Sequence, residues 1–455
     1  MANILHADVL VAEIGSTTTL VNAFSDLDHE PRWLGQGQAP TTVLQGDVCV
    51  GLRNAVSDLS NKLGADVQAT EMLATSSAAG GLSMTVHGLV YDMTVKAAQA
   101  AALGAGAVIR HATAGKLSEF DIEDIKAISP KLILLAGGTD YGERATAVYN
   151  AQMLLDNEVR VPAIFAGNVQ CQRKVEKMYA EAGVPLYVTE NVYPRLDAIN
   201  IEPARRIIQR VFAEHIVRAP GMEKISEMVQ APILPTPGAV MEAAKRMYEQ
   251  YGDLAVIDVG GATTDVHSVT PGSENIALMA TGPEPMAKRT VEGDLGLYVN
   301  AGNLVRQIGE SALSQELGID VPEVMRCYLP IPETAEQFKL TCRLCWEAAS
   351  VALQRHCGVL RHLYSPSGRR TVAEGKDLSE LKYLVATGGA LTRLPQRREI
   401  MRRLADMNVS GMMLLPAPGK IQLLFDDNYI MASLGVLSQS YPEAASQLMS
   451  SCLKP

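Results

Sequence analysis

The feature that most constrains the fold of this chain is a sequence pattern that occurs twice, 245 residues apart. In Val9–Phe24 and in Leu254–Val269, a short apolar run meets a glycine, passes through hydroxyl residues and leaves as a second apolar run. Such a pattern predicts two antiparallel strands joined by a turn. Because the pattern recurs, we predict two halves with the same fold. The matched pairs are Glu13 with Asp258, Gly15 with Gly260, Thr18 with Thr263, Thr19 with Thr264 and Leu20 with Asp265.

The residue types around the second turn suit a phosphate ligand. Gly260 and Gly261 allow backbone N–H groups to approach an anion closely, and the Thr263 hydroxyl adds a donor. Asp258 and Asp265 lie on either side of the turn. A carboxylate beside a triphosphate is repelled unless a divalent cation lies between them, so the pattern indicates a nucleotide with Mg²⁺. Taken alone, the segment is equally consistent with an ordinary hairpin that has polar capping residues.

A third motif near the C-terminus supports the nucleotide interpretation. In 384–395 an apolar run ends in Gly388 and Gly389, and Arg393 and Pro395 follow at the start of a helix. Together the three motifs resemble the two phosphate loops and the adenosine motif of the actin-like ATPase superfamily, which includes sugar kinases, hexokinase, heat-shock chaperone ATPases and actin. The resemblance implies an α/β fold with duplicated ribonuclease-H-like, actin-type halves. It also implies that Gly388, Gly389 and Arg393 border the adenosine.

The same resemblance implies a site for Mg²⁺ and ATP in the cleft between the two halves. Asp258 and Asp265, assisted by Glu13, would organise the metal ion and its waters. Asp265 and Glu13 would also act in hydrolysis. The residues expected to hold the phosphates are Gly15, Ser16, Thr17, Thr18, Gly260, Gly261 and Thr263.

The segment between the first hairpin and the second has a different texture. From about residue 82 to 195, strands alternate with helices, and the strands end in glycine or small polar residues, which predicts a parallel sheet in an inserted βα domain. The loop Ala136–Asp140 in this segment is either a second nucleotide site or a loop shaped by tight packing, and we favour packing. The predicted divisions are 1–81, the first part of the N-terminal half; 82–195, the insertion; 196–250, the return of that half with a connecting helix; and 251–455, the C-terminal half.

Composition excludes several classes of partner. The chain has 455 residues and a formal net charge of −10 with no basic cluster, which argues against a nucleic-acid ligand. The first residues lack a charged segment followed by an apolar run, and the alanine-rich stretch 97–108 is too short to span a membrane. Seven scattered cysteines fit reduced thiols. We therefore expect a cytoplasmic protein with no membrane partner; its oligomeric state stays open.

Over nearly its whole length the chain resembles one branch of the superfamily, the accessory proteins of glutamate mutase, called the MutL/GlmL family and unrelated to mismatch-repair proteins of the same name. The resemblance implies an ATP-dependent reactivating or chaperone-like protein that serves an adenosylcobalamin-dependent aminomutase such as methylaspartate (glutamate) mutase. In that role we expect the insertion at 82–195 to contact the partner. Besides the three ATP motifs, the resemblance rests on Glu13–Thr19, Ser76–Leu82, Ala101–Gly106, Leu135–Asp140, Phe165–Asn168, Asn191–Pro194 and Asn200–Pro203.

Two positions depart from the superfamily pattern. Glu13 stands where the first phosphate loop usually opens with aspartate, although its longer side chain can still reach a metal-bound water. Leu234 stands before Pro-Thr, where the chaperone ATPases have a glutamate. The aliphatic side chain of Leu234 cannot orient a water molecule, so we expect slow hydrolysis. Glu292 and Asp294, in a later glycine-rich loop, either face the γ-phosphate or metal or are simply solvated.

A predicted helix over about 333–364 contains Cys342 and Cys345, with His356 and His362 further along. This spacing allows a zinc or iron–sulfur site, but the apolar flanking residues favour two free cysteines in a core. Two other functions stay open: a small-molecule kinase, and a redox activator of acyl-CoA dehydratases, which would need an iron–sulfur cluster. Finally, Ala432 and Gly435 place small residues on one side of a late helix, which the superfamily resemblance predicts to cross another helix closely.

Overall fold

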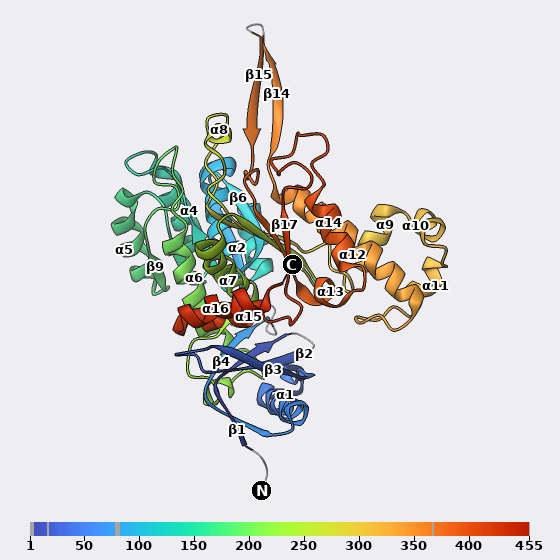
Figure 1. Cartoon of the computed structure of the whole chain (residues 1–455). Helices are drawn as coiled ribbons and strands as arrows, with labels where there is room; N and C mark the ends of the chain where they lie inside the picture. Colours follow the sequence, from blue (N-terminus) through green and yellow to red (C-terminus); the bar gives the residue numbers. More distant parts are fainter. Residues whose placement is uncertain (1–3, 16–17, 78–81, 366–367, 455) are drawn as a thin grey trace. The chain divides into compact units, whose positions relative to one another are not determined.

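A computed structural model of the chain describes residues 4–15, 18–77, 82–365 and 368–454 (Figure 1). The chain divides into two compact units. Unit 1 comprises Met1–Glu242 and Ala432–Ala445, and unit 2 comprises Ala243–Met431 and Ser446–Pro455. The chain therefore passes between the units more than once, and each unit contains sequence from both of the predicted halves.

Unit 1 contains a five-stranded sheet with the order β10-β4-β1-β2-β3. The first three strands are antiparallel, and β4 and β10 add in parallel. The helix α1 (Val48–Leu63) packs so closely on β3 that a Cβ at Gly37 would lie 2.0 Å from the carbonyl oxygen of Ala55. The strands are β1 (Ile4–Ile14), β2 (Thr18–Ser25), β3 (Arg32–Pro40), β4 (Asp66–Ser76) and β10 (Leu234–Pro235).

Unit 2 repeats this topology. Its five-stranded sheet has the order β13-β12-β11-β16-β17, in which three antiparallel strands are again followed by two parallel ones. The duplicated ribonuclease-H-like, actin-type fold that the repeated pattern predicted is therefore confirmed. The strands are β11 (Leu254–Val259), β12 (Thr264–Val269), β13 (Ala287–Glu292), β16 (Tyr383–Thr387) and β17 (Gln422–Phe425).

The strand register shows that the two hairpins match in structure as well as in sequence. Glu13 pairs with Leu20 across the first hairpin, and Asp258 pairs with Asp265 across the second. Each turn is closed by the same backbone bond: the N–H of Gly15 donates to Thr18 over 3.0 Å, and the N–H of Gly260 donates to Thr263 over 3.0 Å. Glu13 and Asp258 thus occupy equivalent places in the two sheets.

The region between β4 and α6 forms a separate five-stranded sheet with the order β6-β5-β7-β8-β9, and all its strands are parallel, as predicted. Successive residues of β7 point to opposite faces: Ile133 and Leu135 pack with α3, α4 and α5, whereas Leu132 and Leu134 pack with α2 and α6. The strands are β5 (Ser83–Gly88), β6 (Val108–Ala114), β7 (Leu132–Leu135), β8 (Ala163–Phe165) and β9 (Leu186–Val188). The helices are α2 (Lys96–Gly104), α3 (Glu119–Ile128), α4 (Ala145–Asp156), α5 (Gln172–Ala182) and α6 (Glu202–Ile216).

Two helices cross closely within unit 1, at the small residues that the sequence indicated. A Cβ at Gly435 in α15 would lie 1.8 Å from the carbonyl oxygen of Ala239 in α7. Ser433, on the same helix, accepts a 2.9 Å hydrogen bond from Asn22 of β2. This confirms the predicted close crossing. The helices concerned are α7 (Thr236–Tyr251), α15 (Met431–Ser440) and, after it, α16 (Pro442–Cys452).

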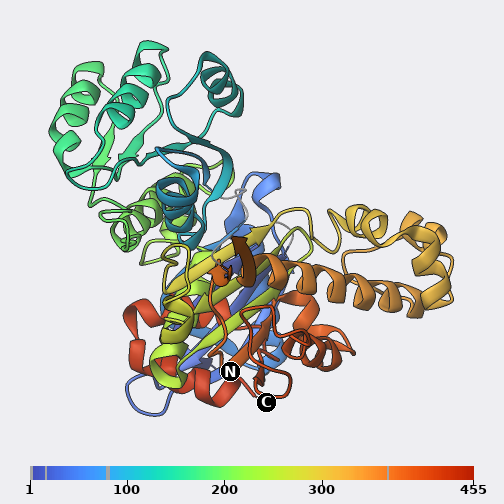
Figure 2. The ribbon, with the colours of Figure 1, turned by 90° about the horizontal axis from the view of Figure 1, so that it is seen from above.

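Within unit 2, α12 (Ala335–His356) has its buried face in the core, and α9, α11 and α14 pack against it (Figure 2). Among the described residues, no helix is long and apolar enough to cross a membrane. The remaining helices are α8 (Glu274–Ala277), α9 (Ala301–Ile308), α10 (Glu310–Leu317), α11 (Val321–Arg326), α13 (Gly388–Arg393) and α14 (Arg397–Ala405). Short 3₁₀ or π turns occur at Val43–Gln45, Tyr91–Val95, Val169–Cys171 and Ile225–Glu227.

The prediction of one helix over about 333–364 was wrong at its C-terminal end. The helix stops at His356, and β14 (Val359–Ser365) and β15 (Gly368–Glu374) form a two-stranded antiparallel hairpin instead. Gly358 lies at the break between α12 and β14, where a Cβ would lie 2.6 Å from the carbonyl oxygen of Glu374. Only glycine at position 358 allows these two segments of the chain to approach so closely.

Candidate functional site

The turn between β11 and β12 is held in place by the loop that precedes α9. The N–H groups of Leu297 and Tyr298 donate to the carbonyl oxygens of Gly260 and Gly261, over 3.1 and 2.8 Å. The side-chain amide of Asn300 donates to the carbonyl of Ala262 over 3.1 Å. Three consecutive carbonyl groups are therefore bound by the protein itself.

The amide groups of the same turn are free. Within the described ranges, the N–H groups of Gly261, Ala262 and Thr263 have no acceptor, and Gly261 and Ala262 are exposed. Consecutive unpaired N–H groups in a turn create a concave patch of positive potential that suits an anion. This donor set fits the phosphate ligand that the sequence predicted.

Asp258 lies at the end of β11, directly beside Gly388. Gly388 is buried with a φ of +82°, and a Cβ on it would lie 2.3 Å from Oδ1 of Asp258. Only glycine fits there. Burial, followed by the neighbouring Asp265 carboxylate, raises the pKa of Asp258 to about 7, although the nearby Arg289 opposes this. A cation beside Asp258 would relieve this cost, so the carboxyl group is suited to a bound metal.

Asp265 has a different environment from Asp258. Its Oδ1 accepts hydrogen bonds from Nε and Nη2 of Arg289, over 2.9 and 2.6 Å, and its Oδ2 accepts one from Thr263 over 2.9 Å. The side chain of Asp265 is 6% exposed and that of Arg289 is 4% exposed. The protein itself therefore neutralises Asp265, whereas the sequence interpretation had treated both aspartates as metal ligands.

Arg289 and Asp426 are site residues that the sequence interpretation missed. Arg289 comes from β13, two strands away from β11. Asp426 follows β17 and is 1% exposed; it accepts from Thr387 Oγ1 and from the N–H groups of Ile430 and Met431, each over 2.9 Å. Burial raises the pKa of Asp426, and the two N–H donors lower it. The positions of Arg289 and Asp426 both depend on strand pairing between distant segments, which no local sequence pattern reveals.

The first hairpin presents its counterpart residues within unit 1. Glu13 is 7% exposed and pairs with Thr75 of β4, as Asp258 pairs with Thr387 of β16. Thr18 is exposed and begins β2. The predicted residues Ser16 and Thr17 lie outside the described residues. The first hairpin thus brings Glu13, Gly15 and Thr18 to one end of its sheet.

The predicted adenosine motif lies at the start of α13. Gly389 is exposed, and a Cβ on it would meet no atom within 4 Å. Arg393, at the end of this helix, is also exposed, and it has no ion-pair partner in the described part of the chain. Unit 2 therefore gathers Gly388, the free amides of the turn and Asp258 around the ends of β11 and β16.

Two acids in the later glycine loop have a protein partner. Nη1 of Arg355 contacts Glu292 over 2.5 Å and Asp294 over 3.1 Å. Burial raises the pKa of Glu292, which the contact with Arg355 opposes. The side chain of Asp294 is 51% exposed, in line with a solvated acid, whereas that of Glu292 is 13% exposed.

Cys342 and Cys345 lie on α12 in the core of unit 2, and both are free thiols. Burial raises the pKa of each, so neither is a ready thiolate ligand. Across the residues that the structure covers, no three His, Cys, Asp or Glu side chains gather as a metal site. Mg²⁺ usually binds through one or two carboxylates, waters and substrate phosphates, so Asp258 still fits such a role.

The loop Ala136–Asp140 is occupied by its own protein contacts. Nδ2 of Asn191 donates to the carbonyl of Gly138 and to Oδ1 of Asp140, each over 3.0 Å. The same Oδ1 accepts from the N–H of Val169 over 3.0 Å. These bonds favour the packing interpretation of this loop.

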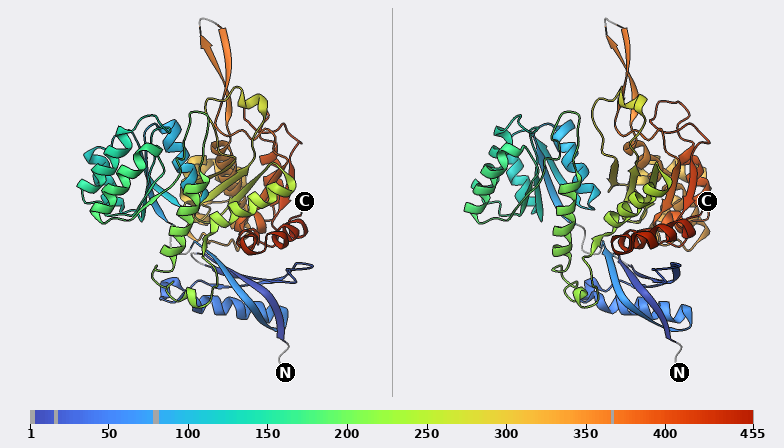
Figure 3. Two further views of the ribbon diagram at one scale, coloured as in Figure 1. Left: turned by 90° about the vertical axis from the view of Figure 1, so that its left-hand side faces the viewer. Right: turned by 60° about the vertical axis from the view of Figure 1, so that its left-hand side comes forward.

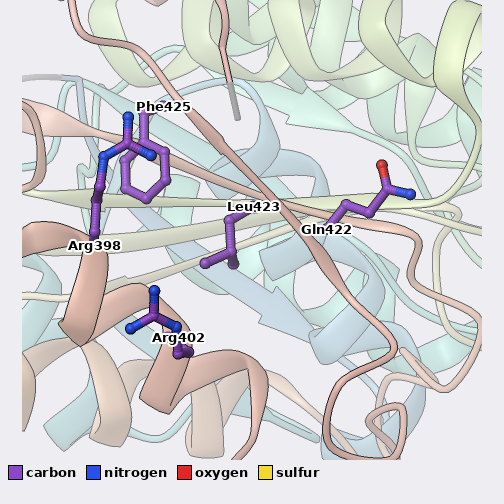
Figure 4. Close-up of a pocket in the computed structure, with 5 residues that line it drawn as sticks. All are labelled: Arg398, Arg402, Gln422, Leu423 and Phe425. Carbon is purple, nitrogen blue, oxygen red and sulfur yellow. The ribbon is translucent and has the colours of Figure 1, made fainter.

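A pocket of about 310 Å³ lies between α14 and β17 (Figure 4). The guanidinium of Arg398 lies over the ring of Phe425, 4.5 Å from its centre. None of the lining residues belongs to the hairpin turns or to α13, so this pocket is separate from the candidate site. They are Arg398, Arg402, Gln422, Leu423 and Phe425.

Two halves with this strand order, each carrying a glycine-containing hairpin, define the class of actin-type ATPase folds. A family model described as MutL protein matches residues 9–453. Protein MutL from Clostridium tetanomorphum is 35% identical over 457 residues, which cover 97% of this chain and 98% of that protein. The chain therefore belongs to the MutL family, as its sequence resemblance indicated. This membership supports an accessory role.

Solved structures with a similar fold are more distant. A nucleotide-free acetone carboxylase is 12% identical, with a TM-score of 0.39, over 96% of this chain and 70% of that one. A glycerol dehydratase reactivase is 12% identical, with a TM-score of 0.36, over 95% of this chain and 100% of that one. A nucleotide-free diol dehydratase-reactivating factor is 11% identical, with a TM-score of 0.37, over 96% of this chain and 100% of that one. At these values the likeness carries no functional argument.

Proposed function

We propose that this chain is an ATP-dependent reactivating protein for an adenosylcobalamin-dependent aminomutase of the glutamate mutase type. Membership of the MutL family supports the accessory role. The observation that carries the nucleotide part is the turn between β11 and β12, where three unpaired N–H groups among the described residues lie next to Asp258. That combination of donors and a destabilised carboxylate suits a phosphate chain with its metal ion.

In this proposal, the residues of unit 2 have separate roles. The N–H groups of Gly261, Ala262 and Thr263 bind phosphate oxygens, and Asp258 binds the waters of Mg²⁺. Bound Mg²⁺ supplies charge neutralisation of the phosphates. Asp265, fixed by Arg289 and Thr263, holds the turn in position instead of binding the metal directly. Gly388, Gly389 and Arg393 border the adenosine.

The first hairpin, with Glu13, Gly15 and Thr18, offers unit 1 a phosphate-binding turn of the same kind. Hydrolysis is slow, because Leu234 supplies no group that can orient water. The corresponding strand of unit 2 is followed by Asp426, whose two carboxylate oxygens already accept bonds from Thr387 and the start of α15. Losing one orienting group commonly costs about 10²-fold or more in rate.

A nucleotide bound at such a turn stabilises one arrangement of the protein over another, and loss of the γ-phosphate removes that preference. Moving such an equilibrium from 1:99 to 99:1 takes about 5.5 kcal/mol. We propose that this change loosens a mutase that holds damaged cobalamin, so that intact cofactor can replace it. The inserted domain at 82–195 is the first candidate for contact with the mutase.

ATP turnover by the purified protein tests the nucleotide part. We expect Mg²⁺-dependent hydrolysis without any acceptor, at a rate well below the roughly 1–100 s⁻¹ of kinases. Asp258→Asn should abolish it, and Lys339→Glu, an exposed change on α12, should not. Hydrolysis at a kinase-like rate, or turnover that needs a small-molecule acceptor, would contradict the proposal.

A further inference from the structure

The hairpin β14–β15 has no role in the proposed nucleotide site, yet it is one of the most regular elements of the chain. Its strands pair without a shift from Val359 with Glu374 to Ser365 with Gly368. They form a two-stranded sheet of their own and extend away from the rest of unit 2 (Figures 1 and 3). A two-stranded ribbon is marginally stable in water unless something packs on it.

The base of the hairpin has neighbours on both edges. Beside β15, the N–H of Ala373 donates to Met279 over 2.8 Å, and beside β14, the N–H of Leu360 donates to Met412 over 2.8 Å. Further out, the described residues provide no strand beside either edge. We call this outer part, residues 361–364 and 369–371, the arm. Its outward N–H and C=O groups are available to an added strand.

The arm exposes apolar side chains that water does not favour. Leu363 is 52% exposed and Tyr364 is 78% exposed. Natural proteins usually protect free strand edges with charges or short strands, and exposed large apolar groups on such an edge mark contact sites. Tyrosine is also among the residues that contribute most to binding at protein interfaces. The arm therefore has the features of a surface that another protein covers.

The charge of the hairpin indicates the chemistry of that protein. Val359–Glu374 contains three arginines and one glutamate, whereas the whole chain has a formal net charge of −10. Arg361 pairs with Glu374 over 2.8 Å, and Arg369 contacts His362 over 2.8 Å. Arg370 has no ion-pair partner among the described residues. A local positive surface on an acidic chain favours an acidic partner, while the remaining negative charge disfavours a polyanion such as nucleic acid.

We propose that the arm docks in an acidic groove of the partner protein, where Leu363 and Tyr364, on opposite faces of the ribbon, are apolar anchors and Arg370, paired with Leu363, faces carboxylates. This inference rests on the proposed function, because the partner is the mutase named there. It adds a contact element to the inserted domain and assigns that element an acidic target. Electrostatic pairing would orient the two proteins, and the anchors would supply most of the affinity.

The test is calorimetric titration of purified glutamate mutase with four forms of this protein in the presence of Mg²⁺-ATP. The forms are the wild type, Arg370→Glu, the double variant Leu363→Ser with Tyr364→Ser, and the control Lys339→Glu. We expect both arm variants to bind about tenfold more weakly or worse, which corresponds to a loss of about 1.4 kcal/mol or more. The control reverses an exposed charge outside the arm and should bind like the wild type.

Each outcome decides the inference. Equal affinity for wild type and both arm variants would overturn it and leave the proposed function standing, whereas failure of the wild type to bind would overturn both. Sedimentation of the protein alone gives a further check: if the arm variants abolish self-association, the arm contacts a second copy and the inference is wrong. The changed residues are exposed, so matching melting temperatures should verify that every variant is folded.

Discussion

At the scale of single residues, Gly388 shows how closely the candidate site is built. Its left-handed backbone and the 2.3 Å separation between an added Cβ and Oδ1 of Asp258 exclude any side chain. We expect Gly388→Ala to lower the free energy of unfolding by about 1–3 kcal/mol and to weaken nucleotide binding. Gly389→Ala is the matched control, because its Cβ meets no atom within 4 Å. Chemical denaturation of both variants checks this, and equal stability would contradict the described packing.

The raised pKa of Asp258, about 7, predicts a specific pH dependence. A carboxyl group whose folded-state pKa exceeds its unfolded value near 4 favours the folded state when protonated, so its stabilising effect declines as pH rises from about 4 to 7. Asp258→Asn removes this decline. At pH 8 the variant should be more stable than wild type by roughly 1–4 kcal/mol, since each pKa unit corresponds to about 1.4 kcal/mol. At pH 4 the two proteins should be alike, and parallel stability curves from pH 4 to 8 would refute the assignment.

Asp265 should respond differently, because its partner is Arg289. Arg289→Met leaves a buried carboxylate without its cation, which commonly costs about 3–5 kcal/mol. Removing both charges together, with Arg289→Met and Asp265→Leu, should restore most of the lost stability. Urea denaturation of the single and double variants measures this coupling. If the double variant were as unstable as the single one, the ion pair would not be the structural element described.

At the scale of elements, the crossing of α7 and α15 depends on the absence of a side chain at Gly435. An added Cβ would lie 1.8 Å from the carbonyl oxygen of Ala239, so the helices must separate. We expect Gly435→Ala to cost about 1–3 kcal/mol, whereas Ser440→Ala on the exposed end of the same helix should stay within about 0.5 kcal/mol. Thermal unfolding compares the two. A neutral Gly435→Ala would show that the helices are not in close contact there.

The sequence predicted those elements whose information is local or repeated. Apolar alternation and glycines located both hairpins, and the 245-residue offset even matched Glu13 with Asp258 in strand register. It did not reveal Arg289, because the ion pair forms only when β13 joins β12. Nor did it find the end of α12, since helical spacing of apolar residues continues past Gly358 into β14. Pairing between distant strands, which competes with local helix propensity, decided both cases.

At the scale of the whole molecule, family membership and the chemistry of the turns point to one account. In the proposed function, a chain with a net charge of −10 holds a triphosphate through backbone amides and Mg²⁺ instead of basic side chains. Unit 1 combines the N-terminal part of the chain with the late segment Ala432–Ala445. In the proposed reactivation, the insertion and the arm are the contacts for the mutase.

Recovery of an inactivated mutase tests whether this protein exchanges damaged cobalamin at the expense of ATP. Glutamate mutase whose cobalamin has lost its adenosyl group is incubated with this protein, Mg²⁺-ATP and free adenosylcobalamin, and its activity is followed over time. The account predicts recovery with the wild type and ATP, no recovery without ATP, and none with Asp258→Asn. Recovery that is independent of ATP, or no recovery with the wild type, would contradict it.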